Sequence, residues 1–174
     1  MSIVAEIQRP DNNVPVDTAL VYRDVEALAS LLSTSFPRAS DVFNILLRRS
    51  DTHIQQMSVR YQVVAKQPLD KAVRTNASMT DMTKKVAVHA IRTACNMTYR
   101  DTMLLKDAMG HNSFAGGISK KKLAIRVCRM HYFKQHWMQI KGEYCGVTGK
   151  SFVEKMSKVD SGVFRDLLTE MASV

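Results

Sequence analysis

The sequence predicts an all-α protein built from two copies of one five-helix unit. Apolar residues recur at helical spacing along most of the 174-residue chain. Only four prolines and seven glycines are present, and runs that alternate apolar and polar residues are rare, so there is little material for a sheet. The order of segments then repeats after roughly 80 residues, which indicates an internal duplication. A hydrophobic content of 45% is sufficient for a core.

The first copy follows a short, turn-rich beginning. We interpret residues 1–15 as an N-terminal tail or linker, because the stretch Pro10–Pro15 favours turns. Residues 16–95 are then expected to form five helices. Their inward apolar positions are Leu20, Val25, Leu28, Ala29 and Leu32; Val42, Phe43, Ile45, Leu46 and Leu47; Ile54, Met57, Tyr61 and Val64; Leu69, Ala72 and Val73; and Met82, Val86, Ala90, Ile91 and Ala94.

Polar residues and proline mark the boundaries of these helices. The stretch from Ser33 to Pro37 ends the first helix, and Ser40 or Asp41 is a candidate cap for the second. Ser50 and Asp51 start the third helix, and Pro68 opens the fourth, where proline is tolerated.

The second copy, residues 96–174, repeats the same order. A first helix ends near Ala108, a loop covers Gly110–Ser119, and the fourth helix carries Phe152 where the first copy has Leu69. A last helix begins at about Asp160. The apolar positions are Met103, Leu104 and Ala108; Leu123, Ile125, Val127 and Cys128; Trp137, Ile140 and Tyr144; Phe152; and Val163, Phe164, Leu167, Leu168 and Met171.

The formal charge of +9 gives the surface a potential that attracts polyanions: nucleic acid, acidic lipid or acidic protein.

Cys95, Cys128 and Cys145 lack close pairing and fall in helical patterns, so we expect free thiols packed as small hydrophobes in a reducing, cytoplasmic compartment. The beginning has no signal-peptide pattern, and no run approaches the roughly 18 apolar residues of a membrane span. Any membrane contact is therefore expected to be peripheral.

The ordered motifs of both copies resemble annexin repeats. The second copy carries the resemblance in Leu123–His131, Met138–Tyr144, Gly149–Ser151 and Ser161–Leu168, and the first copy in Val42–Ser50 with Tyr61, Pro68, Leu69 and Val73. The resemblance implies that each repeat is a right-handed superhelix of five helices. It also implies calcium-dependent binding to acidic phospholipid through two loops of each repeat. Most annexins have four repeats, and this chain resembles their C-terminal half, so an exposed apolar face is expected to favour a homodimer.

Calcium takes six to eight oxygen ligands, which annexin repeats supply from a glycine-rich turn and a carboxylate in a later loop. In the first copy the turn falls at residues 34–37 and the acidic position at Asn76, so neither glycine nor carboxylate is present. In the second copy the resemblance implies a weak metal site from Gly116, Gly117 and Asp160. We therefore expect strong calcium binding to be absent.

Direct charge is the expected replacement for calcium at the membrane. Lys120, Lys121, Lys122 and Arg126 adjoin the loop of the second copy, and Arg38 adjoins the loop of the first copy. Phe36 and Phe114 fall at the loop tips, where an aromatic ring can insert among acyl chains. The lysines are equally consistent with a solvated helix start. A scaffold that binds only proteins and a basic nucleic-acid-binding module remain alternatives, although no familiar nucleic-acid recognition motif is present.

Two further motifs are weaker than they look. Gly149–Ser151 resembles the end of a phosphate-binding loop, but Tyr144 stands where that loop requires glycine. Cys128, His131 and His136 are zinc-type ligands at an unsuitable spacing, so structural roles are expected for the histidines. Trp137 and Tyr144 are expected in the core. No residue pair suggests catalysis, so we do not expect an enzyme.

Overall fold

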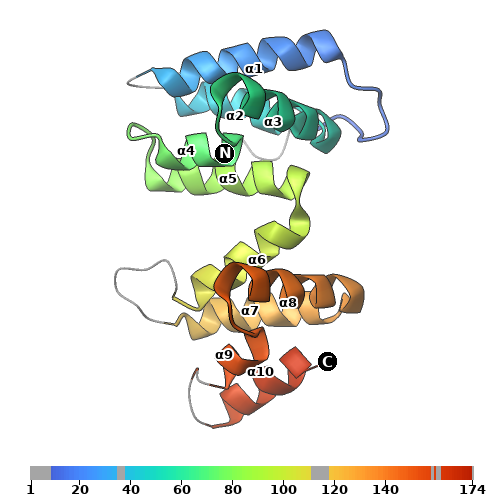
Figure 1. The fold of residues 1–174 in the computed structure, drawn as a ribbon, viewed down its shortest axis with the longest axis vertical. Helices are drawn as coiled ribbons and strands as arrows, with labels where there is room; N and C mark the ends of the chain where they lie inside the picture. Colours follow the sequence, from blue (N-terminus) through green and yellow to red (C-terminus); the bar gives the residue numbers. More distant parts are fainter. Residues whose placement is uncertain (1–8, 35–37, 111–117, 158, 160–161, 174) are drawn as a thin grey trace, which may run out of the picture. The chain divides into compact units, whose positions relative to one another are not determined.

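The computed structural model describes residues 9–34, 38–110, 118–157, 159 and 162–173. Within these ranges it contains ten helices and no strand, and the chain divides into two compact units, Met1–Met97 and Thr98–Val174 (Figure 1). The all-α class predicted from periodicity is therefore confirmed. In chain order the helices are α1 (Thr18–Ser33), α2 (Ala39–Leu47), α3 (Asp51–Ala65), α4 (Leu69–Thr75), α5 (Asp81–Cys95), α6 (Met97–Ala108), α7 (Lys120–His131), α8 (Lys134–Thr148), α9 (Phe152–Met156) and α10 (Val163–Ser173).

Side-chain caps explain where several helices of the first unit begin. The Asp17 carboxylate accepts from the backbone N–H groups at the start of α1, and Ser50 and Thr80 do the same for α3 and α5. The expectation for α2 was wrong: Arg38 occupies the cap position without a side-chain cap, and Ser40 and Asp41 lie inside the first turn. An acidic residue in that turn still interacts favourably with the helix dipole.

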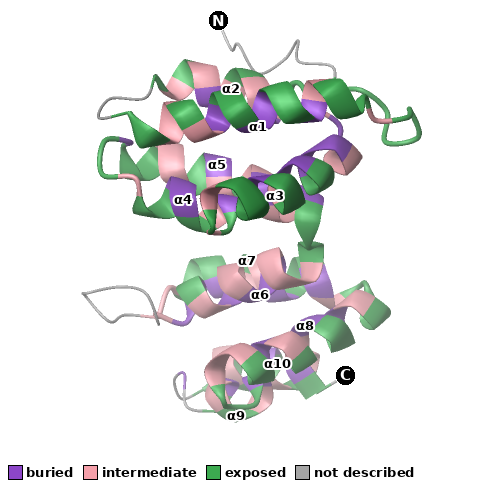
Figure 2. Cartoon of the chain, turned by 45° about the horizontal axis from the view of Figure 1, so that its top comes forward, coloured by how far each residue is buried: buried purple, intermediate pink, exposed green. Residues whose placement is uncertain are grey.

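The first unit has its own core. Helix α3 packs on α1 and α5, and α5 also packs on α2 and α4. Figure 2 shows the buried positions of these helices in purple. The largest fully buried side chains here are Leu28, Leu46, Ile54, Met57 and Leu69. Each such side chain, once removed from water, stabilises the fold by about 1.5–3 kcal/mol.

The second unit is built around three aromatic rings. Trp137 and Tyr144 on α8 both meet Phe152 edge to face, with ring centroids 5.4 and 5.1 Å from the Phe152 ring. All three side chains are at most 1% exposed, which confirms that Trp137 and Tyr144 are core residues. Because Phe152 opens the short helix α9, these contacts hold α9 against α8.

Buried residues recur in the two units at one constant spacing. Ile54, Met57 and Tyr61 on α3 correspond to Trp137, Ile140 and Tyr144 on α8, and Leu69 corresponds to Phe152. Every one of these side chains is buried. Equivalent helices therefore present equivalent faces to the core, as a duplicated unit requires.

Several apolar side chains that were expected to face the core are exposed to solvent. Met82 and Val86 on α5 are 72% and 44% exposed, because the buried side of that helix is Ala87, Ile91 and Ala94. On α3, Val64 is 50% exposed, since Tyr61 is the last buried position before the helix ends. On α10, Val163 and Leu167 are exposed while Leu168 and Ala172 face the core.

The cysteines also depart from expectation. Cys95, Cys128 and Cys145 are free thiols, as predicted, but all three are exposed instead of packed in the core. Each lies next in sequence to a core residue, one position off the buried side of its helix. Within the described residues, every helix is too short or too polar to span a bilayer.

Candidate functional site

The end of α6 and the start of α7 form the basic end of the second unit. The Ser119 amide donates a 2.9 Å hydrogen bond to the Ala108 carbonyl, so the two helix ends are held together at the base of the connecting loop. Lys120, Lys121 and Lys122 follow as the first turn of α7, and all three are exposed. Three successive cations therefore project, in different directions, from the first turn of one helix.

Arg126 is less exposed than these lysines. Its guanidinium donates to the Leu104 carbonyl on α6 and lies 3.6 Å from the Asp107 carboxylate. The side chain is only 19% exposed. Arg126 therefore links α6 to α7, and part of its charge is balanced within the unit.

The remaining site candidates are divided between described and undescribed residues. Phe36, Phe114, Gly116, Gly117 and Asp160 lie outside the described residues, so their predicted roles stay predictions. Arg38 is described: it precedes α2, its side chain is 85% exposed, and it lies 3.6 Å from Asp41 one turn further on.

Asn76, the residue at the acidic ligand position that the resemblance implies, joins the end of α1 to the α4–α5 loop. Its side-chain amide donates to the Leu32 carbonyl at the end of α1 over 3.1 Å. Its side-chain oxygen accepts from the backbone N–H groups of Ser78 and Met79 over 3.0 and 3.1 Å. One neutral side chain thus bridges the end of α1 to the α4–α5 loop (Asn76 to Thr80).

This geometry does not fit a calcium site in the first unit. Calcium requires anionic and carbonyl oxygens directed at one point, whereas the Asn76 oxygen is already engaged by two N–H groups and its amide turns a donor toward Leu32. Across the described part of the chain, no three His, Cys, Asp or Glu side chains gather to hold a metal.

Each unit also contains a buried aspartate paired with a histidine. In the first unit the Asp24 carboxylate accepts from His53 Nε2 at 2.9 Å and from Arg49 Nε at 2.6 Å. We assign the proton to Nε2 because an ionised carboxylate can only accept. Burial lowers the pKa of His53 below its ordinary value and outweighs the hydrogen bond to Asp24, which raises it. The pair joins α1 to the first turn of α3.

The second unit repeats the pair with a different arginine. Asp101 on α6 accepts from His136 Nε2 at 2.9 Å and from Arg100, its neighbour in sequence, at 2.6 Å. Burial raises the pKa of Asp101, but the hydrogen bonds from Arg100 and His136 lower it by a larger amount. The pKa of Asp101 therefore lies below its ordinary value. His53 and His136 are separated by the constant spacing of the duplication, but Asp24 and Asp101 are not, so that spacing could have related the two histidines and not their aspartate partners.

The zinc-type residues Cys128, His131 and His136 and the glycine of the Gly149–Ser151 motif have structural explanations. His131 Nδ1 lies 3.0 Å from the Met171 carbonyl and His136 binds Asp101, while Cys128 is exposed, so the three residues form no metal site. The structural roles expected for both histidines are confirmed. Gly149 ends α8 with a φ of 67°, a conformation that glycine adopts without a steric penalty.

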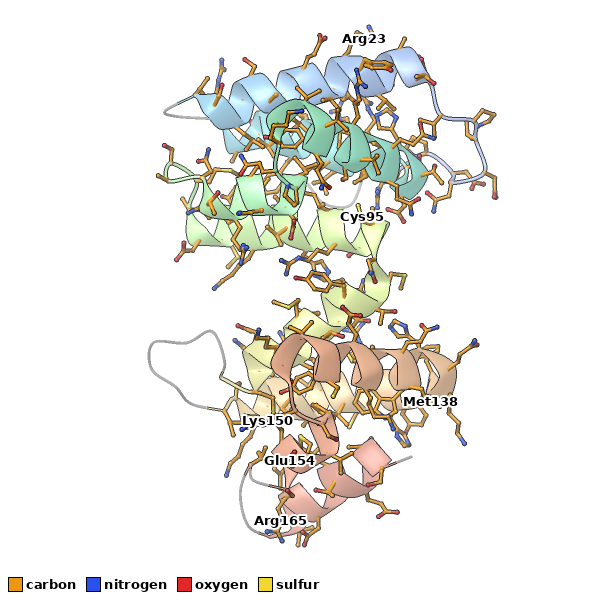
Figure 3. All side chains as sticks on the ribbon, in the orientation of Figure 1. Arg23, Cys95, Met138, Lys150, Glu154 and Arg165 are labelled. Carbon is orange, nitrogen blue, oxygen red and sulfur yellow. The ribbon has the colours of Figure 1, made fainter. Side chains whose placement is uncertain are left out.

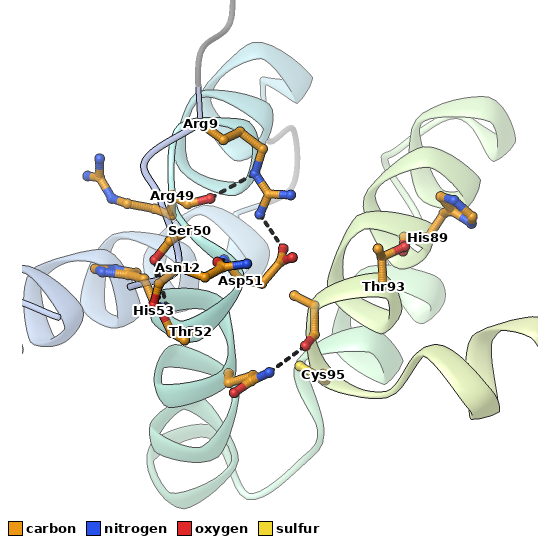
Figure 4. Close-up of polar contacts among 12 residues, drawn as sticks. Arg9, Asn12, Arg49, Ser50, Asp51, Thr52, His53, His89, Thr93 and Cys95 are labelled. Atoms are coloured by element: carbon orange, nitrogen blue, oxygen red, sulfur yellow. Dashed lines mark hydrogen bonds and ion pairs between the residues drawn. The ribbon is translucent and has the colours of Figure 1, made fainter. Parts of the chain in front are cut away.

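The N-terminal segment is attached to the first unit at the junction of α2 and α3. Arg9 donates to the Arg49 carbonyl and pairs with Asp51, and the Asn12 side chain accepts from the Asp51 amide at 2.7 Å. Figure 4 shows Arg9 and Asn12 lying over the first turn of α3. The described part of the predicted tail therefore covers this corner.

Comparison with known proteins identifies the fold. No protein-family model matches the sequence, and no curated protein matches it. Solved structures do match: chicken annexin V (TM-score 0.74, 17% identity, 95% of this chain), a mutant of annexin A8 (0.74, 15%, 94%) and calcium-bound alpha-14 giardin (0.69, 16%, 91%). The alignments cover 50%, 47% and 51% of those chains, so this chain spans about half the length of the structures it matches. The chain therefore has the annexin fold, with five helices in each of two units.

Proposed function

We propose that this protein is an annexin-like, non-enzymatic module that binds peripherally to acidic phospholipid surfaces. The observation that supports the proposal is the exposed run Lys120–Lys122 at the start of α7, on an annexin fold. The three lysines lie in the first turn of α7, whose start is joined to the end of α6 by the Ser119 to Ala108 hydrogen bond, so the fold itself holds their backbone in place for binding.

The expected strength follows from the number of cations. Each Lys or Arg near an anionic bilayer contributes about 1 kcal/mol, so three lysines supply about 3 kcal/mol, or roughly a hundredfold in partitioning. Arg38 would add a contact from the first unit, and Phe36 and Phe114 would add apolar insertion. Arg126 contributes less in this proposal, because Asp107 lies beside it.

Calcium is expected to contribute little to this membrane binding. The alpha-14 giardin match is a calcium-bound structure, and the resemblance implies calcium-dependent binding. In the first unit, however, the acidic ligand position that the resemblance implies is Asn76, whose side-chain oxygen already accepts from two backbone N–H groups. We propose that Gly116, Gly117 and Asp160 form at most a weak site and that the lysines carry most of the affinity.

The test is sedimentation with vesicles of phosphatidylcholine, with and without phosphatidylserine, across a calcium titration. Pelleting is expected only on the acidic vesicles and largely without calcium. A variant with Lys120, Lys121 and Lys122 changed to glutamine should bind roughly a hundredfold more weakly. No pelleting on acidic vesicles at any calcium concentration would refute the proposal.

A matched control separates local contact from net charge. Lys66, Lys71 and Lys150 are also exposed, and changing these three to glutamine removes the same charge from other corners of the fold. This control should bind nearly as well as the unmodified chain. An equal loss in both variants would mean that the total charge of +9, not the start of α7, drives the binding.

A further inference from the structure

The junction of α7 and α8 presents two aromatic side chains to solvent. Tyr132, which follows α7, is 80% exposed, and Phe133, which precedes α8, is 67% exposed. The Tyr132 ring meets the His131 ring edge to face with centroids 5.7 Å apart, and His131 Nδ1 lies 3.0 Å from the Met171 carbonyl on α10. The Tyr132 ring is therefore held in place at the surface, as aromatic side chains of protein interaction sites typically are.

Two exposed cations flank these rings. Arg129 lies three residues before Tyr132, and Lys134 is the first residue of α8. We call Arg129, Tyr132, Phe133 and Lys134 the aromatic corner. Residues 108–142 contain seven Lys or Arg and no Asp or Glu, so the charge of this stretch has a single sign. The surface that a partner would meet at the corner is therefore apolar and positive.

The first unit shows how the equivalent junction is occupied. Helices α3 and α8 both contain 15 residues, and their first residues, Asp51 and Lys134, hold equivalent positions in the duplication. A non-helical segment of the chain lies on Asp51 (Figure 4). Arg9 pairs with the Asp51 carboxylate at 2.7 Å, and the Asn12 side-chain oxygen accepts from the Asp51 amide at 2.7 Å. The start of this helix is therefore a place where a chain segment docks.

The second unit keeps the junction but inverts its charge and adds apolar surface. Lys134 stands where the first unit has Asp51, and Phe133 stands at the cap position where the first unit has Ser50. Ser50 accepts from the His53 amide, whereas α8 begins without a side-chain cap. A segment that docks on the second unit must therefore supply carboxylates in place of an arginine, and an apolar side chain to cover the rings.

We propose that the aromatic corner binds an acidic, non-helical segment of a partner protein. The carboxylates of this segment face Arg129 and Lys134, and its apolar side chain packs on the two rings. The N-terminal segment of a second copy is a poor occupant, because its Arg9 would meet Lys134. Tyr132 lies about 18 Å along α7 from Lys120, so a segment bound at the corner leaves the proposed membrane-binding lysines accessible. This inference goes beyond the proposed lipid binding and does not depend on it.

The test is an NMR titration of the full chain, without vesicles, with a capped peptide that alternates aspartate and leucine. The amide signals of Phe133, Lys134 and Gln135 should shift, and those of Thr148 and Gly149, at the other end of α8, should not. One comparison peptide alternates lysine and leucine, and another alternates aspartate and serine. Both should bind at least about tenfold more weakly, because each lacks one of the two required chemistries. No shift at the corner with the aspartate–leucine peptide at about millimolar concentration would overturn the proposal.

A charge reversal gives a sharper variant. Lys134→Glu should weaken binding of the aspartate–leucine peptide about tenfold and strengthen binding of the lysine–leucine peptide, because the helix then starts with the sign that Asp51 gives α3. An acidic residue in the first turn interacts favourably with the helix dipole, so this variant should fold. The matched control is Lys150→Glu, which makes the same change at an exposed position just past the other end of α8 (Figure 3). An equal loss in both variants would overturn the proposal.

A second variant tests the rings. Tyr132→Ser should weaken binding of the aspartate–leucine peptide about fivefold to tenfold, since the peptide loses an aromatic contact. Val59→Ser removes an apolar side chain that is 69% exposed on α3, and it should leave the binding unchanged. Unchanged binding in Tyr132→Ser would mean that the rings take no part, which overturns the proposal.

The same variants identify any other occupant of the corner. Weaker sedimentation of Tyr132→Ser with acidic vesicles, without peptide binding, would assign the corner to lipid. A salt-sensitive response of the Lys134 amide to duplex DNA, in place of the peptide, would assign it to nucleic acid. Conversion of a dimer to a monomer by Lys134→Glu in light scattering would assign it to a second copy. Each of these results would overturn the protein partner, whereas loss of vesicle binding alone would refute only the proposed function.

Discussion

Asn76 is expected to hold the end of α1 to the α4–α5 loop without a metal. The perturbation is Asn76→Ala, which removes the bond to the Leu32 carbonyl and the two bonds accepted from Ser78 and Met79. The side chain is half-buried, and the Leu32 carbonyl and Met79 amide would lose a partner in the protein.

The magnitude follows from those three bonds. A neutral hydrogen bond contributes about 1 kcal/mol net, and partial access of water to this loop reduces the total to about 1–2 kcal/mol. Local opening of the loop should become more favourable by that amount. The amide protons of Ser78 and Met79 should therefore exchange about 5- to 30-fold faster.

The assay is amide hydrogen exchange measured by NMR at Ser78 and Met79. The Ala87 amide in the buried side of α5 serves as the internal reference, and its exchange should not change. Asn76→Asp provides a second comparison: its carboxylate can still accept from both amides but cannot donate to Leu32. That variant should retain protection at residues 78 and 79. Unchanged exchange in Asn76→Ala, or equal acceleration at Ala87, would refute the local bridging role.

Three further predictions concern the cores and the surface. Burial lowers the pKa of His53 in the folded state below the ordinary value of 6.5, so as the pH falls His53 is protonated first in the unfolded state. Protonation then favours the unfolded state, and the folded protein loses stability. His53→Gln should therefore flatten the fall in stability between about pH 7 and pH 5, measured by urea unfolding followed by circular dichroism; an unchanged slope would exclude His53 as the cause. Phe152→Ala should destabilise the second unit by about 3–5 kcal/mol, followed by the fluorescence of Trp137, the single tryptophan, and a loss below about 1 kcal/mol would contradict the aromatic core. A dimer mass is expected by light scattering at micromolar concentration, and Leu167→Glu should dissociate it while Val59→Glu, on α3, should not; a monomer mass for the unmodified chain would refute the dimer.

Much of the fold was predictable because it depends on local repetition. Helical spacing around Leu28, Met57 and Tyr144 predicted buried faces, and the structure confirms them. The inward positions at the ends of helices were less predictable, as Met82 and Val64 show. A helix end often extends beyond the neighbour that would bury it, and periodicity does not reveal how far that neighbour reaches.

The candidate site was predictable only as a set of residue types. Lys120, Lys121 and Lys122 could be identified from the sequence, and they are exposed as a basic helix start should be. Sequence could not show that Arg126 turns toward Asp107, or that Tyr132 stands in water. Those outcomes depend on which side of α7 faces α6, α8 and α10.

The sequence by itself determined the helical class, the two repeated units and the excess of positive charge, because each depends on local spacing or simple composition. Tertiary structure alone decided that Asn76 bridges the end of α1 to the α4–α5 loop, that Asp24 and Asp101 each bind a histidine from another helix, and that α7 has a basic outer face next to the exposed ring of Tyr132. The physical reason is that hydrogen bonds and burial depend on which distant segments meet.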